Sequence, residues 1–107
     1  MSMNAVFRAL ADPVRRRLLD RLQARNGQTL GELRQGLDMT RQAVTKHLAI
    51  LEAASLVVRV RRGREKLHFL NPVPIHAIGE RWIAKFQRLV LEALAELERH
   101  FEGEGHD

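Results

Sequence analysis

The 107-residue sequence contains no cysteine, no tyrosine and one tryptophan, and no apolar run approaches the roughly twenty residues of a membrane-spanning helix. Without cysteine the chain can form no disulfide, no thiolate metal site and no cysteine nucleophile. The sequence also lacks a basic-then-apolar leader with a small-residue cleavage site. We therefore expect a soluble, cytoplasmic protein, with residues 1–107 forming one domain around a single core.

Positive charge is concentrated before residue 80. The formal net charge is +5, and residues 1–79 hold 14 Lys and Arg against 6 Asp and Glu. Residues 80–107 hold 4 against 7. A basic N-terminal part suits a polyanion such as nucleic acid, although many basic proteins bind none.

The first part of the chain has the pattern of two short helices. Apolar residues at helical spacing predict a helix over residues 3–11. Asp12-Pro13 then ends it and starts another, because Asp is a good N-cap and proline is tolerated at the first helical position. Of the basic run 15–17, we expect at least one arginine on a solvated helix face, while another could reach a phosphate.

Residues 29–54 have the pattern of two further helices joined by a tight turn. Thr29 and Glu32 match a capping box, Gly36 supplies the turn, and Thr40 suits the N-cap of the second helix. Such a pair is typical of a helix-turn-helix that inserts into the DNA major groove. Helical hairpins are also common in other small α-proteins.

The second helix of this pair has two unlike faces. Val44, Leu48 and Leu51 form a narrow apolar stripe. The other side carries residues that can bind bases or phosphates: Thr40, Arg41, Gln42, Thr45 and Lys46. Arginine can pair with guanine and glutamine with adenine, whereas Lys46 suits a phosphate. We expect His47, beside the apolar stripe, to be partly buried.

The apolar period changes from 3.6 to 2 in residues 56–70, which predicts a β-hairpin. Gly63-Arg64 fits a type II′ loop that pairs Val58 with Phe69 and Val60 with Leu67. We expect this apolar face to pack on the helix pair. The opposite face and the tip would then present cations to phosphates or to a minor groove: Arg59, Arg61, Arg62, Arg64, Lys66 and His68. The alternative is an ordinary edge hairpin made basic to discourage aggregation.

A long helix is expected over residues 74–102, after the break at Asn71-Pro72-Val73-Pro74. Its apolar stripe is wider than a small core can cover, so a second copy of the chain is the simplest partner. The alternative is a helix that wraps its own domain. The expected dimer contacts come from this helix and the first one: Trp82, Phe86, Leu89 and Leu97, with Met3, Phe7 and Leu10.

In order and spacing, these elements resemble the ArsR-type winged-helix repressors of bacteria and archaea. The resemblance covers nearly the whole chain and is carried by FRALADPVRRRLLDRL (7–22), TRQAVTKHLAILEAASLV (40–57) and RRGREKLHFLNP (61–72). It implies a mainly α fold with a small β-hairpin, a winged helix-turn-helix that binds double-stranded DNA. It also implies a homodimer joined through the first and last helices, and repression by blocking a promoter, often the protein's own.

The metal ligands of that family have no counterparts here. Its Cys-x-Cys pair corresponds to the helix 29–36, which holds Leu33-Arg34-Gln35, and its histidine ligands correspond to residues 80–92, which contain no histidine. His76 with Glu80, and His100 with a neighbouring glutamate, supply two ligands each, whereas a closed transition-metal site has four. We therefore expect no metal and no cofactor.

Other functions have weaker support. No Ser-His-Asp set and no glycine-rich loop after a strand can be found, so we expect no enzyme. A winged-helix module that binds protein or RNA is disfavoured by the donor-rich outer face of 41–49 and by the lack of aromatics suited to base stacking. A third alternative keeps the DNA binding and adds a small molecule held between long helices near Trp82 and Phe86.

Overall fold

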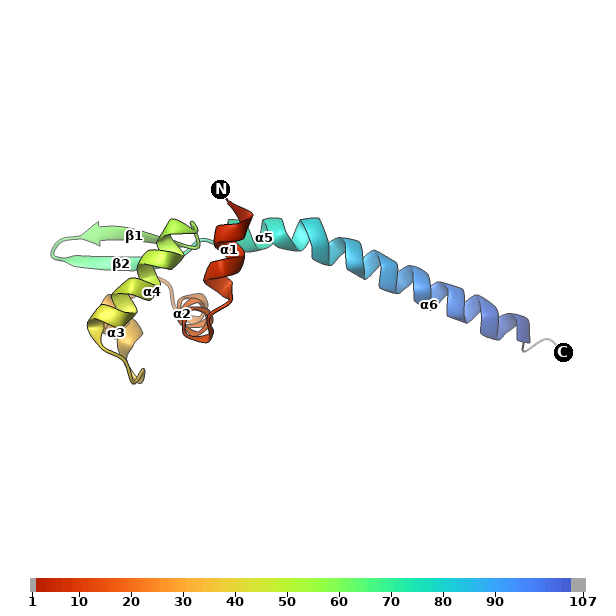
Figure 1. The fold of residues 1–107 in the computed structure, drawn as a ribbon, viewed down its shortest axis with the longest axis horizontal. Coiled ribbons are helices and arrows are strands. Elements are labelled where there is room, and N and C mark those ends of the chain that lie inside the picture. The colour runs from red at the N-terminus through yellow and green to blue at the C-terminus, as the bar shows by residue number, and fades with distance from the viewer. Residues whose placement is uncertain (1, 105–107) are drawn as a thin grey trace. The chain divides into compact units, whose positions relative to one another are not determined.

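A computed structural model describes residues 2–104 as two units, one ending at Ile75 and the other beginning at His76. The first unit contains α1 (Met3–Leu10), α2 (Pro13–Ala24), α3 (Leu30–Arg34), α4 (Arg41–Ala53), and the strands β1 (Val57–Arg62) and β2 (Glu65–Leu70). Figure 1 shows the hairpin projecting from the group formed by α1 to α4. This arrangement is the mainly helical winged helix-turn-helix that the sequence predicts.

Side-chain caps mark the starts of α2, α3 and α4, as the sequence predicts. The Asp12 carboxylate accepts the backbone N–H two residues later at 2.8 Å, with proline at the first helical position. Thr29 and Glu32 form the reciprocal capping box, and the Thr40 hydroxyl accepts the N–H three residues later at 3.1 Å. Gly36 has a φ of +76°, which permits the tight turn between α3 and α4. Each cap contributes about 1 kcal/mol and fixes where its helix begins.

The core of the first unit is aliphatic. Its buried side chains come from α1 to α4, from the segments that follow α3 and α4, and from the start of β1: Val6, Ala9, Leu18, Leu19, Leu22, Leu33, Leu37, Val44, Leu48, Leu51, Ala54, Leu56 and Val57. Burial of each larger aliphatic side chain stabilises the fold by roughly 1.5–3 kcal/mol. Val44, Leu48 and Leu51 are at most 3% exposed, so the apolar stripe of α4 faces the core as predicted.

The hairpin has the predicted register but packs through the opposite face. Val58 pairs with Phe69 and Val60 with Leu67, which confirms the register. Val58 and Val60 are 49% and 45% exposed, however, whereas His68 on the other face is 4% exposed. The expectation that the Val58 face packs on the helices was therefore wrong.

Backbone pairing with the loop before α3 determines which face of the hairpin turns inward. The N–H of His68 donates to the carbonyl of Gln28 at 2.8 Å, and Gln28 and His68 form an isolated antiparallel bridge. Val57 enters the core four residues after α4 ends and lies on the same face as His68. These two contacts leave Val58 and Val60 on the outside.

The second unit is helical throughout the residues described. α5 (Val73–Ile78) runs across the boundary at Ile75 and continues as a π-helical turn, η1 (Gly79–Ile83), and as α6 (Ala84–Glu104). The sequence predicted one helix over 74–102 and gave no sign of the π-helical turn. None of the helices within residues 2–104 combines the length and the apolarity needed to cross a membrane.

Candidate nucleic-acid interface

The first two turns of α4 present the residues that the sequence predicted to contact DNA bases or phosphates. Arg41, Gln42, Thr45 and Lys46 are all exposed, and the exposed Thr40 caps the helix just before them. The Thr45 hydroxyl donates to the carbonyl of Arg41 at 2.8 Å. The structure therefore gathers these five predicted residues at the exposed start of one helix.

Two arginines that the sequence analysis did not single out hold the turn before α4. The Arg34 side chain donates from Nε to the carbonyl of Met39 at 2.8 Å, directly before the N-cap. Arg21 of α2 donates from Nη1 to the carbonyls of Leu33 at 2.8 Å and of Gln35. Both arginines satisfy carbonyls that a short helix and a tight turn leave unpaired. They fix the direction in which α4 leaves α3.

Two arginines of the basic run in α2 donate hydrogen bonds to backbone carbonyls at the end of α1. Arg15 donates from Nε to the carbonyl of Ala9 at 2.8 Å, and Arg16 donates to that of Leu10 at 2.7 Å. Both side chains therefore cap the C-terminal carbonyls of α1. Arg17 is exposed, in accord with the prediction of at least one solvated member.

Arg15 also links α2 to α4 through His47. Its Nη1 lies 3.2 Å from Nδ1 of His47, which is partly buried as predicted. The same imidazole nitrogen lies 3.9 Å from the Asp12 carboxylate. Burial acts to raise the pKa of Asp12, but the N–H groups of Arg15 and Val14 and the charges of His47 and Arg15 together hold it below its usual 3.8.

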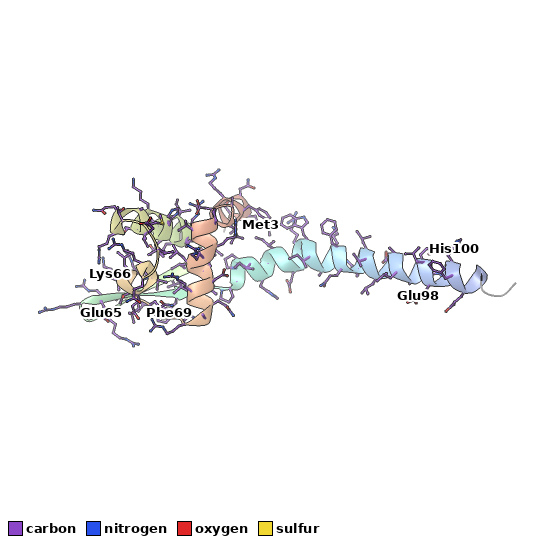
Figure 2. The ribbon with its side chains drawn as sticks, turned by 90° about the horizontal axis from the view of Figure 1, so that it is seen from below. Met3, Glu65, Lys66, Phe69, Glu98 and His100 are labelled. Atoms are coloured by element: carbon purple, nitrogen blue, oxygen red, sulfur yellow. The ribbon has the colours of Figure 1, made fainter. Side chains whose placement is uncertain are left out.

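An open groove of about 590 Å³ separates α4 from the inner face of the hairpin. Its lining comes from α3, α4 and the hairpin: Thr29, Leu30, Gly31, Arg41, Thr45, Leu48, Ala49, Glu52, Arg59, Arg64, Glu65, Lys66 and His68. In Figure 2, Glu65 and Lys66 lie toward the tip of the hairpin and Phe69 nearer its base. The groove thus brings together cations from the start of α4 and from the β1–β2 hairpin, which is the wing of this fold.

The remaining predicted contacts, Thr40 among them, lie outside that lining. Gln42 and Lys46 are exposed on α4, and Arg61 and Arg62 are exposed near the hairpin tip. Arg61 donates from Nε to the carbonyl of Gly63 at 3.3 Å. Within residues 2–104, none of these four side chains takes part in an ion pair.

Glu52, one of the two carboxylates that line the groove, lies among these cations and was not predicted from the sequence. Glu52 Oε1 of α4 lies 3.8 Å from Arg59 Nε and 4.0 Å from His68 Nε2. His68 is buried, and its Nδ1 lies 2.9 Å from the carbonyl oxygen of Gln28. The expectation that His68 is displayed on an outward basic face was therefore wrong. Arg59 remains half exposed, but Glu52 balances part of its charge.

The histidines of the second unit form no metal cluster within residues 2–104, where no group of three or more His, Cys, Asp or Glu comes together. His76 Nε2 lies 3.1 Å from Glu80 Oε1, and both side chains are exposed. The Glu96 carboxylate pairs with Arg99.

The chain is similar to known transcriptional regulators. The profile of a family described as a helix-turn-helix domain matches residues 10–61. YuzN, an HTH-type transcriptional regulator of Bacillus subtilis, is 41% identical over 86 residues, which is 75% of this chain and 94% of YuzN. The transcriptional repressor SdpR of the same species is 33% identical over 64% of this chain and 76% of SdpR.

A solved structure extends the similarity to nearly the full length. An ArsR-like transcriptional regulator from Rhodococcus sp. RHA1 superposes with a TM-score of 0.73 at 30% sequence identity. The match covers 94% of this chain and 91% of that regulator.

Proposed function

The chain belongs to the ArsR-type family of helix-turn-helix transcriptional regulators, and we propose that it is a homodimeric repressor that binds an inverted-repeat DNA operator. As a member of this family it is a DNA-binding regulator and not an enzyme. In this proposal it acts in the cytoplasm and blocks a promoter, with its own promoter as one candidate. Repression is supported by the similarity to the repressor SdpR.

The observation that carries the proposal is the exposed start of α4 beside a groove lined with cations. Arg41 and Gln42 can each make two hydrogen bonds to one base, Arg41 to guanine and Gln42 to adenine. Lys46 is assigned to a phosphate. Thr40, just before α4, is a small donor that can approach either, whereas the Thr45 hydroxyl, which donates to the carbonyl of Arg41, can accept from a base.

The wing supplies the sequence-independent part of the proposed interface. Arg64 and Lys66 line the groove, and Arg61 and Arg62 flank it near the hairpin tip. Arginines at such a tip can enter a minor groove or contact the phosphates on either side of it. Arg59 contributes less, because its Nε lies 3.8 Å from the Glu52 carboxylate, which balances part of its charge.

The homodimer is supported by apolar surface that one copy of the chain leaves exposed. Phe86, Leu89 and Leu97 of α6 are 62%, 56% and 53% exposed, and Phe7 of α1 is 44% exposed. The other proposed contacts, Met3, Leu10 and Trp82, are partly exposed. A twofold pair would present two recognition helices to major grooves about 34 Å apart on one side of the duplex.

Selection of bound duplexes from a random pool, at near-physiological salt, tests this function. We expect enrichment of an inverted repeat whose half-sites are centred about 10–10.5 base pairs apart, or a multiple of that spacing. Gln42→Ala should relax the preference at one position of each half-site. The matched control is Arg17→Ala, which removes an exposed cation outside the groove and should leave the enriched sequence unchanged. A pool without enriched sequences, or one enriched in a single asymmetric site, would contradict the proposal.

A further inference from the structure

The groove between α4 and the hairpin has an apolar part beside its charges. Leu30 and Gly31 of α3, together with Leu48 and Ala49 of α4, line it without contributing a polar side-chain group. Leu48 is 3% exposed and belongs to the core, whereas Ala49 is exposed. Ala49 therefore offers an accessible methyl group to a ligand that enters the groove.

Ala49 shares a side of α4 with two residues that the proposed function assigns to the DNA. It follows Thr45 by four residues and Gln42 by seven, and these spacings place side chains on one side of a helix. Thr45 and Ala49 are both exposed, and both line the groove. Bases stacked next to the one that Gln42 contacts therefore lie within reach of Thr45 and Ala49.

The Thr45 hydroxyl has already used its hydrogen within the protein. It donates to the carbonyl of Arg41 at 2.8 Å, and this bond turns the hydroxyl back toward the helix backbone. A threonine hydroxyl has a single donor hydrogen, so Thr45 keeps no donor for a base. Its γ-methyl group then becomes the natural contact for a ligand, one helical turn before the methyl group of Ala49.

We propose that Thr45 and Ala49 together bind the C5-methyl group of one thymine in each half-site of the operator. The inference rests on the repressor function proposed above and adds to it the base that these two residues select. Thymine carries a methyl group on its major-groove edge, and alanine and the threonine methyl group are suited to contact it. Gln42 binds a different base through hydrogen bonds, so the two contacts contribute to specificity independently.

Replacement of thymine by uracil tests this contact, because uracil pairs with adenine in the same way and lacks only the methyl group. The duplex is the inverted repeat selected from the random pool, with each thymine replaced in turn in both half-sites, and fluorescence anisotropy with the full chain measures the affinity. Burial of one methyl-sized group corresponds to a factor of about four, so replacing the contacted thymine in both half-sites should weaken binding roughly fifteenfold. A C·G pair at that position should bind more tightly when its cytosine carries a 5-methyl group.

Variants of the two residues assign the methyl contact to them. Thr45→Val keeps a γ-methyl group and should retain the preference for thymine over uracil, whereas Thr45→Ser keeps only the hydroxyl and should bring the ratio of the two affinities toward one. Ala49→Gly should also lower this ratio. Because the ratio is taken within each variant, a less stable helix that weakens binding to both duplexes alike does not change it. Lys46→Ala is the control, and should weaken both affinities equally.

The outcomes separate this inference from the function on which it rests. A selected repeat in which no thymine is required, or in which uracil replaces every thymine without loss of affinity, would overturn the methyl contact and leave the repressor function intact. So would a wild-type ratio in both Thr45→Ser and Ala49→Gly. A pool without any enriched sequence would overturn the proposed function and this inference together.

Discussion

Removal of the Glu52 carboxylate should strengthen DNA binding, although Glu52 itself stabilises the folded protein. Glu52 Oε1 lies 3.8 Å from Arg59 Nε in the groove between α4 and the wing. In Glu52→Gln, the side chain keeps its shape and loses its charge. Arg59 is then available to a phosphate, and a negative charge that would repel the DNA backbone is gone.

The size of the effect follows from the geometry. Two unit charges 3.8 Å apart interact by about 4 kcal/mol at an effective dielectric constant of about 20. The side chains of Arg59 and Glu52 are 49% and 27% exposed, so solvent screening reduces the contribution of the pair to about 1 kcal/mol. We therefore expect Glu52→Gln to lower the free energy of unfolding by no more than about 1 kcal/mol, and to raise DNA affinity about fivefold.

Fluorescence anisotropy across a range of salt concentrations measures this prediction on the selected duplex. One additional phosphate bound by each chain of the dimer should steepen the plot of log K against log salt by up to about 0.9 per chain, or about 1.8 for the dimer. Arg59→Ala in the Glu52→Gln background is the control, because it should remove the increase in affinity. An affinity that falls in Glu52→Gln, or an increase that persists without Arg59, would refute this account of the groove.

Four further perturbations test other parts of the molecule. Gln42→Ala should weaken binding by roughly 1–3 kcal/mol on the preferred site and by little on random DNA, as measured by competition binding. Equal losses of affinity on both kinds of DNA would show that Gln42 does not contact a base. Neutralising Arg62 and Arg64 should flatten the plot of log K for DNA binding against log salt by up to about 0.9 for each phosphate that the wing no longer binds, with little change in melting temperature. A large fall in melting temperature at an unchanged slope would show that the hairpin has only a structural role. Leu89→Glu should place an unpaired charge among the proposed dimer contacts of α6, at several kcal/mol per ion, and yield monomeric or unfolded chain without operator binding. A dimer of wild-type affinity in sedimentation would exclude Leu89 from those contacts. Asp12 has a lowered pKa in the fold, so its contribution to stability is present above its usual value of 3.8 and is lost as pH falls through the folded value. Asp12→Asn retains a cap without a titrating group, and should therefore lose less melting temperature than wild type between roughly pH 5 and pH 2; identical profiles would show that Asp12 is not linked to folding.

Short-range features of the fold were readable in the sequence. The caps at Asp12, Thr29 and Thr40 are satisfied by groups two or three residues away, so their signals lie within one turn of helix. The register of the hairpin follows from Gly63 and the loop length, and the faces of α4 follow from helical periodicity. These elements required no knowledge of distant contacts.

Long-range contacts decided what the sequence could not. The hairpin has an apolar face and a polar face, and apolarity alone favoured packing through Val58 and Val60. The inward face was determined instead by His68, which bonds to Gln28 forty residues earlier. The same contacts bring Glu52 to Arg59, and contacts between helices commit Arg15 and Arg16 to the end of α1. His68, Arg15 and Arg16 provide partners for backbone groups that remain unpaired after the helices have packed. No local stretch of sequence reveals which backbone groups those will be.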